Sequence, residues 1–305
     1  MRCMIVDIGS NTVKYDLFSF KNGRMKIEDR RSEALRLVAQ IEDGALTAAG
    51  MEALCATLNG FLEVAKAQSC PAVYAFATAG MRRLRDPQRA LTEIKARTGL
   101  TVRLLSGEEE AACSFEGMLH TLKKPPKRGV MLDMGGGSTE LNFFEDKRSL
   151  WLCSCPFGAV STKNALRLGE TLSENEKEKV NAFARSFLPP EATDFAPQSK
   201  TAVLVGGTAK AIAKLAKEFL GLETPEKLKI DEFLRLRELL CAPSAAQSAR
   251  VRELCPDRYA LMATGACAFA ALFAALGTKK VRICRGGIRE GYLARICREK
   301  EENHG

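Results

Sequence analysis

Histidine is nearly absent from the 305-residue sequence, which contains only His120 and His304. So little histidine leaves no readable Ser–His–Asp triad or Cys–His pair, the arrangements with which many hydrolases activate a nucleophile. The eleven cysteines are scattered, the nearest pair being Cys153 and Cys155, so neither a zinc-ligand spacing nor the disulfide framework of a small secreted domain occurs. Such cysteine usage suits a reducing compartment, and we expect a cytoplasmic protein.

Long apolar runs are also scarce. The first residues, MRCMIVDIGSN, reach an aspartate after too short an apolar run to serve as a signal peptide. Residues 259–276, YALMATGACAFAALFAAL, are eighteen residues without a charge, the lower edge of membrane-spanning length. Eight of them are alanine, which inserts weakly and suits close helix packing. We therefore predict a buried core helix here and no membrane partner.

No low-complexity tract interrupts the chain, and 46% hydrophobic with 27% charged residues is typical of a folded protein. The length suits about two domains. A formal net charge of +9 favours a polyanionic partner, because a positive field concentrates anions around the protein. Nucleic acid, polyphosphate, nucleotides and acidic membranes all qualify on charge alone.

The order of apolar runs and turns predicts an α/β fold. The chain opens with a β-hairpin, and strands then alternate with helical segments such as residues 47–68 and 87–98. The segment KKPPKR, residues 123–128, joins two prolines to four cations and is the best linker candidate. We predict one lobe over residues 1–124 and a second over 129–305, whose last helix could pack back on the first.

An internal repeat supports two similar lobes. Asp7 superposes on Asp133 at a spacing of 126 residues, with apolar strands on both sides. The superposition also pairs Ile8 with Met134, Gly9 with Gly135 and Thr12 with Ser138. Two lobes that face each other across a cleft follow from this repeat.

Three glycine turns follow strands and could bind phosphate, because such turns direct successive backbone N–H groups into one concavity. They comprise Gly9, Ser10, Asn11 and Thr12; Gly135, Gly136, Gly137, Ser138 and Thr139; and Gly206, Gly207 and Thr208. The third opens a helix, whose dipole also favours an anion. A single glycine turn between strands is most often only a turn, and neither GxGxxG nor GxxxxGK[ST] occurs.

Two carboxylates flank the second turn. Asp133 and Glu140 lie on the two strands that this turn joins, so a hairpin would bring them to one end of the sheet. Magnesium commonly bridges one or two carboxylates to substrate phosphates. The alternatives are that Asp133 only holds the turn through backbone hydrogen bonds and that Glu140 is an exposed strand residue.

A further acidic cluster begins a helix at SGEEEA. Ser106 is placed to cap this helix, and Glu109 stands three residues later, at the capping-box position. Glu110 is left without a local structural role and could face a cleft as a general base, since phosphoryl hydrolysis needs a group that orients or deprotonates water.

Three arginines lie close together in TAGMRRLRD: Arg82, Arg83 and Arg85. Guanidinium groups bind phosphate in bidentate fashion, which makes these arginines candidates for substrate contacts. The alternative for each is a solvated basic surface.

Read together and in order, seven segments resemble the exopolyphosphatase / guanosine pentaphosphate phosphohydrolase (Ppx/GppA) family of the actin-like ATPase superfamily. They are VDIGSNTVK, ATAGMRR, LLSGEEEA, LDMGGGSTEL, PFGAVS, VGGTAKAIAKL and GGIREGYL. SGEEEA followed by DMGGGSTEL separates this family from the kinases of the superfamily. The resemblance implies two actin-like (ribonuclease H-like) lobes with mixed sheets that face an interdomain cleft, in a short form without the C-terminal domains of longer members.

The resemblance also implies roles for individual residues. Glu110 would activate water, and Arg82 would grip substrate phosphate. Asp133 and Glu140 would surround Mg²⁺, and we add Asp7 as a third candidate ligand. The backbone and hydroxyl groups of the three turns, Ser138 included, would hold the terminal phosphates. The implied reaction removes a terminal phosphoryl group from polyphosphate or from guanosine pentaphosphate, with no nucleic-acid partner, in a homodimer.

Departures from the family pattern leave other functions open. Arg83 stands where the family usually has an acidic residue, and Cys284 and Arg285 stand where serine and aspartate are common. A more basic cleft could favour long polyanions or change what is bound. A non-catalytic alarmone or nucleotide sensor is the main alternative, and a small-molecule kinase on the shared scaffold is a further one.

Overall fold

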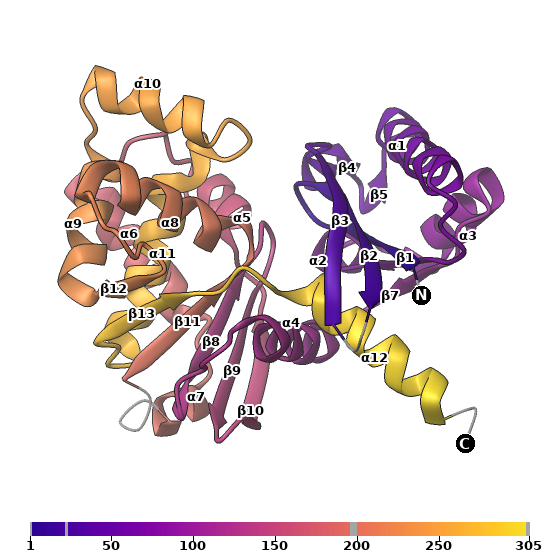
Figure 1. Cartoon of the computed structure of the whole chain (residues 1–305). Coiled ribbons are helices and arrows are strands. Elements are labelled where there is room, and N and C mark those ends of the chain that lie inside the picture. Colours follow the sequence, from indigo (N-terminus) through magenta and orange to yellow (C-terminus); the bar gives the residue numbers. More distant parts are fainter. Residues whose placement is uncertain (1, 22–23, 196–199, 303–305) are drawn as a thin grey trace. The chain divides into compact units, whose positions relative to one another are not determined.

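The computed structural model describes residues 2–21, 24–195 and 200–302 (Figure 1). The chain divides into two compact units, residues 1–107 and 108–305. The division follows Gly107, the first residue of helix α4 (Gly107–Thr121), whereas the sequence places the linker after this helix, at residues 123–128. Each unit is an α/β structure built on one mixed sheet, as the sequence predicts.

The sheet of the first unit has the strand order β3-β2-β1-β6-β7. Its strands are β1 (Arg2–Ile8), β2 (Val13–Lys21), β3 (Arg24–Glu33), β6 (Val73–Ala77) and β7 (Val102–Leu104). The first three form an antiparallel meander, β6 adds to β1 in parallel, and β7 adds to β6 in parallel. The predicted opening hairpin is therefore confirmed.

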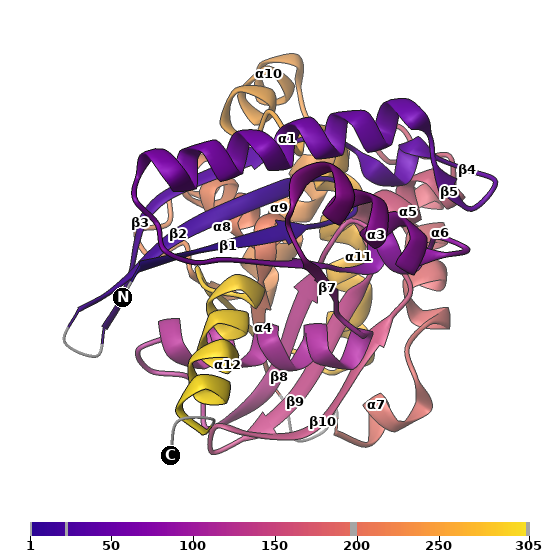
Figure 2. The ribbon, with the colours of Figure 1, turned by 90° about the vertical axis from the view of Figure 1, so that its right-hand side faces the viewer.

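Helix α1 (Ala48–Ala67) runs along this sheet (Figure 2) and buries Leu54, Leu58 and Phe61 against it. The other elements of the unit are η1 (Leu37–Gln40), β4 (Ile41–Glu42), β5 (Ala45–Leu46), α2 (Ala79–Arg82) and α3 (Pro87–Thr98). Thr47 caps α1 by accepting a hydrogen bond from the Gly50 N–H. The cap satisfies one of the backbone donors at the start of α1 that no helical hydrogen bond can use.

The sheet of the second unit repeats this plan with the order β10-β9-β8-β11-β13-β12. Its strands are β8 (Arg128–Met134), β9 (Thr139–Glu145), β10 (Arg148–Cys155), β11 (Thr201–Val205), β12 (Lys227–Lys229) and β13 (Lys280–Ile283). An antiparallel meander comes first, and β11 and β13 then add in parallel. The shared order confirms the duplication that the sequence predicts.

Most helices belong to the second unit. After α4 come α5 (Ala159–Ala165), α6 (Glu174–Ser186), α7 (Pro190–Phe195), α8 (Gly206–Leu220), α9 (Ile230–Cys241), α10 (Ala245–Leu254), η3 (Tyr259–Leu261), α11 (Met262–Ala275) and α12 (Ile288–Glu302). Twelve residues of α11 are buried, which confirms the predicted core helix.

Among the described residues, no single helix has the length and apolarity for a membrane span. One pair passes that test together, but α10 and the η3–α11 segment are bent by 114°.

Helices α4 and α12 lie side by side and approach to backbone contact (Figures 1 and 2). A Cβ on Gly291 would stand 1.8 Å from the Cys113 carbonyl oxygen, and one on Gly117 would stand 1.8 Å from the Gly287 oxygen. Only glycine permits this approach. The crossing holds α4, the helix that carries Glu110, within the second unit.

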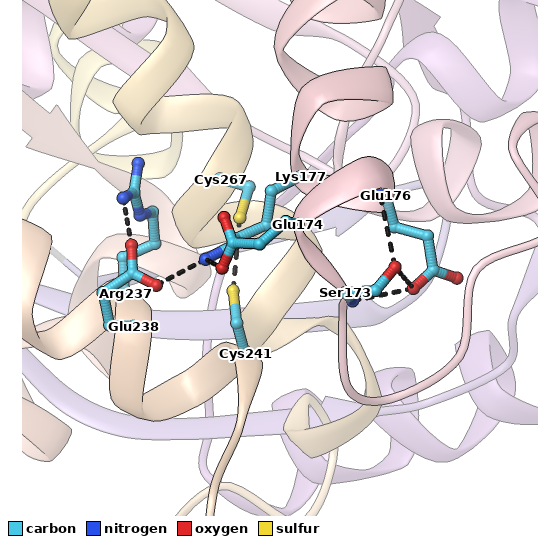
Figure 3. A network of polar contacts seen from close by, with 8 residues as sticks. All are labelled: Ser173, Glu174, Glu176, Lys177, Arg237, Glu238, Cys241 and Cys267. Carbon is cyan, nitrogen blue, oxygen red and sulfur yellow. Dashed lines mark hydrogen bonds and ion pairs between the residues drawn. The ribbon is translucent and has the colours of Figure 1, made fainter.

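An ion-pair network joins α6 to α9 (Figure 3). The buried Lys177 pairs with Glu174 on its own helix and with Glu238 on α9, 2.5 Å away. Close by, the Sγ atoms of Cys241 and Cys267 lie 3.4 Å apart, both buried between α9 and α11. These ion pairs let the Lys177 side chain be buried at low cost, because its charge is paired.

Candidate active site

The two repeated turns have the same hydrogen-bond geometry. The Gly9 N–H donates to the Thr12 carbonyl at 3.1 Å, and the Gly135 N–H donates to the Ser138 carbonyl at 2.9 Å. Each turn follows the strand-end aspartate at the same register, since Ile8 pairs with Val13 as Met134 pairs with Thr139. The duplicated sequence therefore folds into duplicated turns.

The first turn is supported by α2. A Cβ on Gly80 would stand 2.9 Å from the Ser10 Cα, so this glycine lets α2 lie directly against the turn. Arg82, at the end of α2, donates to the Leu105 carbonyl at 2.9 Å. Arg82 is thus half-buried and anchored at the end of β7, while Arg83 and the nearby Arg85 are exposed. Asp7, Ser10 and Thr12 are buried.

The second turn is supported by α5, which explains the motif PFGAVS. The Ala159 N–H donates to the Gly135 carbonyl at 3.0 Å, and the Val160 and Ser161 N–H groups donate to the Gly136 carbonyl at 3.0 and 2.9 Å. A trans peptide directs its N–H opposite to its C=O. The amides of Gly136 and Gly137 therefore point away from α5, as a phosphate-binding turn requires.

Asp133 is buried at the end of β8 and is held by α4. The Ser114 hydroxyl donates to Asp133 Oδ2 at 2.6 Å, and the Ser114 side chain is completely buried. Ser114 lies four residues after Glu110, so both side chains project from the same face of α4. One helix therefore positions the predicted base and the predicted magnesium ligand.

Glu140 is buried beside two other acids. It is 1% exposed and accepts a hydrogen bond from Ser154 at 2.8 Å. Burial raises the pKa of Glu140 well above its ordinary value, and the nearby carboxylates of Glu110 and Asp133 raise it further. Glu140 is therefore not an exposed strand residue, and the second unit gathers three carboxyl groups at one end of its sheet.

The third turn reaches the same place. Gly206 begins α8 with a φ of +85°, and a Cβ there would stand 2.4 Å from Asp133 Oδ1. The Thr208 hydroxyl donates to the Met134 carbonyl at 3.4 Å, next to the second turn. The start of α8, a fifteen-residue helix, thus lies against Asp133 and adds the positive end of its dipole.

Arg258 is a site residue that sequence reasoning missed. A Cβ on Gly207 would stand 2.2 Å from the Arg258 Nη2, so the guanidinium lies over the start of α8. Burial lowers the pKa of Arg258. The Asp133 carboxylate opposes this shift and the Arg289 guanidinium adds to it, so both of these charged groups lie near Arg258. The signal in the sequence is slight: Arg258 is the last charge before the uncharged run 259–276.

The predicted residues thus form two groups. The second unit brings together Glu110, Asp133, Glu140 and the second and third turns, and the first unit brings together Asp7, Arg82 and the first turn. In the part of the chain that the structure describes, no group of three or more histidine, cysteine, aspartate or glutamate side chains is close enough to hold a metal ion alone.

Two departures from the family pattern have structural explanations. Arg285 is exposed and donates to Glu226 at 2.8 Å, so part of its charge is neutralised. Cys284 is buried in the apolar cluster under α4, with its Sγ 3.1 Å from the Thr121 hydroxyl. Cys284 serves packing, and its burial raises the pKa of its thiol.

Comparison with known proteins agrees with this description. Exopolyphosphatase 1 of Mycobacterium tuberculosis and that of Mycobacterium leprae are each 25% identical over 307 residues, covering 97% of this chain and 88% and 89% of the relative. The crystal structure of an exopolyphosphatase from Cytophaga hutchinsonii superposes with a TM-score of 0.87 at 18% identity, covering 97% of both chains. That of the Aquifex aeolicus Ppx/GppA family member gives 0.81 at 23% identity, covering 100% of this chain and 99% of the other. These superpositions show that the chain has the same fold as both proteins. The family model described as the Ppx/GppA phosphatase family matches residues 17–300, so the chain belongs to that family and is a phosphoric anhydride hydrolase.

Proposed function

We propose that this protein is a magnesium-dependent exopolyphosphatase that releases the terminal phosphate of inorganic polyphosphate, with guanosine pentaphosphate as a second substrate. The observation that carries the proposal is the second turn. Its carbonyl groups are bound by α5, so its amides point to the opposite side, and buried carboxyl groups stand beside it. Family membership supports the same reaction class.

In the proposed reaction, the amides of the second and third turns bind the oxygens of the terminal phosphate. Glu110 accepts a proton from water as the water oxygen bonds to phosphorus, and the bond from phosphorus to the bridging oxygen breaks. The shortened polyphosphate leaves with the electron pair of that bond. Ser114 holds Asp133, and α4 holds Glu110, so both groups are fixed before substrate binds.

The acidic residues fit a divalent cation. Burial and the neighbouring carboxylates of Glu110 and Asp133 raise the pKa of Glu140, and an adjacent cation would stabilise its ionised form. Asp133 and Glu140 would supply the protein ligands, with Asp7 as the third candidate. Because the described side chains form no complete metal cage, substrate oxygens would complete the coordination, which is the usual mode for Mg²⁺. Bound Mg²⁺ would neutralise charge on the phosphate oxygens.

Charge supports a polyanionic substrate. The net charge is +9, Arg258 is held over the third turn, and Arg82 is anchored on Leu105 in the first unit. The charge of Arg285 is instead paired with Glu226, which weakens the expectation that this departure favours long chains. We expect phosphate release from short and long polyphosphate, in a cytoplasmic homodimer.

The test is phosphate release from polyphosphate of defined length, with and without Mg²⁺. Glu110→Gln should lower kcat by about 10²- to 10⁴-fold, the range for loss of a general base. The matched control is Glu108→Gln, an exposed acid two residues earlier in the same helix, which should leave turnover unchanged. Binding of guanosine pentaphosphate without hydrolysis would instead indicate a sensor, and ATP-dependent phosphorylation of an added acceptor would indicate a kinase.

A further inference from the structure

Asn142 is an exceptional polar residue in the core of the second unit. It lies on β9 and is 0% exposed, and neither its amide nitrogen nor its amide oxygen has a hydrogen-bond partner among the described residues. A buried amide without partners is costly, and native proteins contain few of them. Asn142 therefore needs either an unseen partner or a reason outside stability.

The strand places Asn142 in line with the active site. Side chains alternate along a strand, so Glu140, Asn142 and Phe144 share one face of β9. The Phe144 ring packs 5.4 Å from the Phe115 ring of α4, which identifies this as the face covered by α4. Asn142 thus stands between the acidic cluster and an apolar cluster under the same helix.

The surroundings of Asn142 favour an apolar residue. It pairs in register with Met131 of β8 and Leu152 of β10. Met131 belongs to the apolar cluster that includes Phe115, Met118 and Phe144. A hydrophobic side chain at position 142 would join this cluster and avoid the cost of a buried amide. The asparagine therefore gives up stability, as residues at functional sites often do.

The position of Glu140 supplies the reason. Its Oε1 accepts from Ser154 on the neighbouring strand, and the Ser138 side chain also hydrogen-bonds the carboxyl group. Residues two apart on a strand are separated by about 6.8 Å, a span that two side chains and one water molecule can bridge. Buried waters usually bind otherwise unsatisfied polar groups.

We propose that Asn142 is a positioning residue for Glu140, holding a buried water that bridges its amide to the Glu140 carboxyl group. The inference rests on the proposed function, in which Glu140 acts beside the reacting phosphate. The water would add a third contact to those of Ser138 and Ser154 and would complete the positioning of the carboxyl group. Loss of such a supporting contact typically costs 10- to 100-fold in activity or metal affinity.

An isosteric pair of variants separates positioning from packing. Asn142→Val removes all hydrogen bonding, and Asn142→Thr has the same shape but keeps a hydroxyl that can bind the water. We expect Asn142→Val to raise the urea midpoint of unfolding and to lower kcat about 10- to 100-fold at nearly constant KM for polyphosphate. Asn142→Thr should recover most of kcat.

Thr278→Val is the matched control, because Thr278 is another buried polar residue of this unit whose side chain, a hydroxyl, has no partner among the described residues. Thr278→Val should raise the urea midpoint of unfolding, as Asn142→Val does, and leave kcat unchanged. The proposal fails if Asn142→Val keeps full kcat, or if the Val and Thr variants are impaired equally, since shape would then explain the effect.

A direct structural readout keeps this proposal separate from the proposed function. A high-resolution crystal structure of the unmodified protein should show one ordered water between the Asn142 amide and the Glu140 carboxyl group. Absence of that water would overturn the inference even if polyphosphate is hydrolysed. Its presence in a protein that releases no phosphate would overturn the proposed function and leave the water contact established.

Discussion

Gly206→Ala tests the connection between the third turn and Asp133. Gly206 adopts a φ of +85°, and its Cβ would stand 2.4 Å from Asp133 Oδ1, where ordinary contacts begin at 3.4 Å. The carboxyl group must therefore move by about 1 Å, and that movement breaks its 2.6 Å hydrogen bond with Ser114. We expect a loss of both stability and activity.

The size of the stability loss follows from two contributions. A positive φ costs a non-glycine residue about 1–2 kcal/mol, and a hydrogen bond to a charged group contributes about 1.5–3 kcal/mol. Gly221→Ala is the matched control at the other end of α8, because Gly221 has a φ of +64° and nothing within 4 Å of its would-be Cβ. The free energy of unfolding should fall by about 2.5–5 kcal/mol for Gly206→Ala and about 1–2 kcal/mol for Gly221→Ala.

Activity provides the second readout of this prediction. A displacement of about 1 Å in a catalytic group costs about 10²-fold in rate, so Gly206→Ala should lower kcat for phosphate release by that factor. Gly221→Ala should keep the original kcat. Urea denaturation monitored by circular dichroism gives the stabilities. Equal losses of stability and equal activities in the two variants would refute the reasoning.

Three further predictions concern stability. Ion pairs with Glu174 and Glu238 raise the pKa of Lys177 to about 12. The stability that these pairs contribute is therefore fully present below the ordinary pKa of lysine and should be lost as the pH rises toward 12. Urea unfolding of Lys177→Met should accordingly depend less on alkaline pH than unfolding of the unmodified protein. Gly291→Ala should unfold or loosen the α4–α12 crossing, seen as faster hydrogen exchange in α4, because its Cβ would stand 1.8 Å from a backbone oxygen. Gly60→Ala, in α1 with nothing within 4 Å, should instead stabilise by about 0.5–1 kcal/mol in thermal unfolding.

Local patterns in the sequence were sufficient to predict the turns. An apolar strand, an aspartate and a glycine occur twice, and both copies form the same hydrogen-bonded turn in the same register. The uncharged run 259–276 was equally informative, because its alanine content indicated close packing and most of α11 is buried. In each case neighbouring residues in the sequence determine the structure.

Residues whose roles depend on distant packing were not predictable in this way. Ser114 lies 19 residues from Asp133, and only the packing of α4 on the sheet brings the two together. Arg258 reaches Gly207 from the turn between α10 and η3, and no local pattern encodes this approach. The motif PFGAVS was recognisable as a family segment, but its function of binding the turn carbonyls is visible only in the structure.

Divergence between the two copies indicates which turn is suited to chemistry. In the first unit, the residue paired in register with the strand-end Asp7 is Lys14; in the second, the residue paired with Asp133 is Glu140. Directly opposed residues in an antiparallel pair share one face, so Lys14 can offset the charge of Asp7, whereas Glu140 adds a second acid. Two adjacent buried acids are stable only with a cation or proton beside them. We infer that the first turn is suited to hold an anion and that the second is suited to hold a cation together with phosphate. Asp7, which lies beside the first turn, is therefore the weakest of the three candidate magnesium ligands.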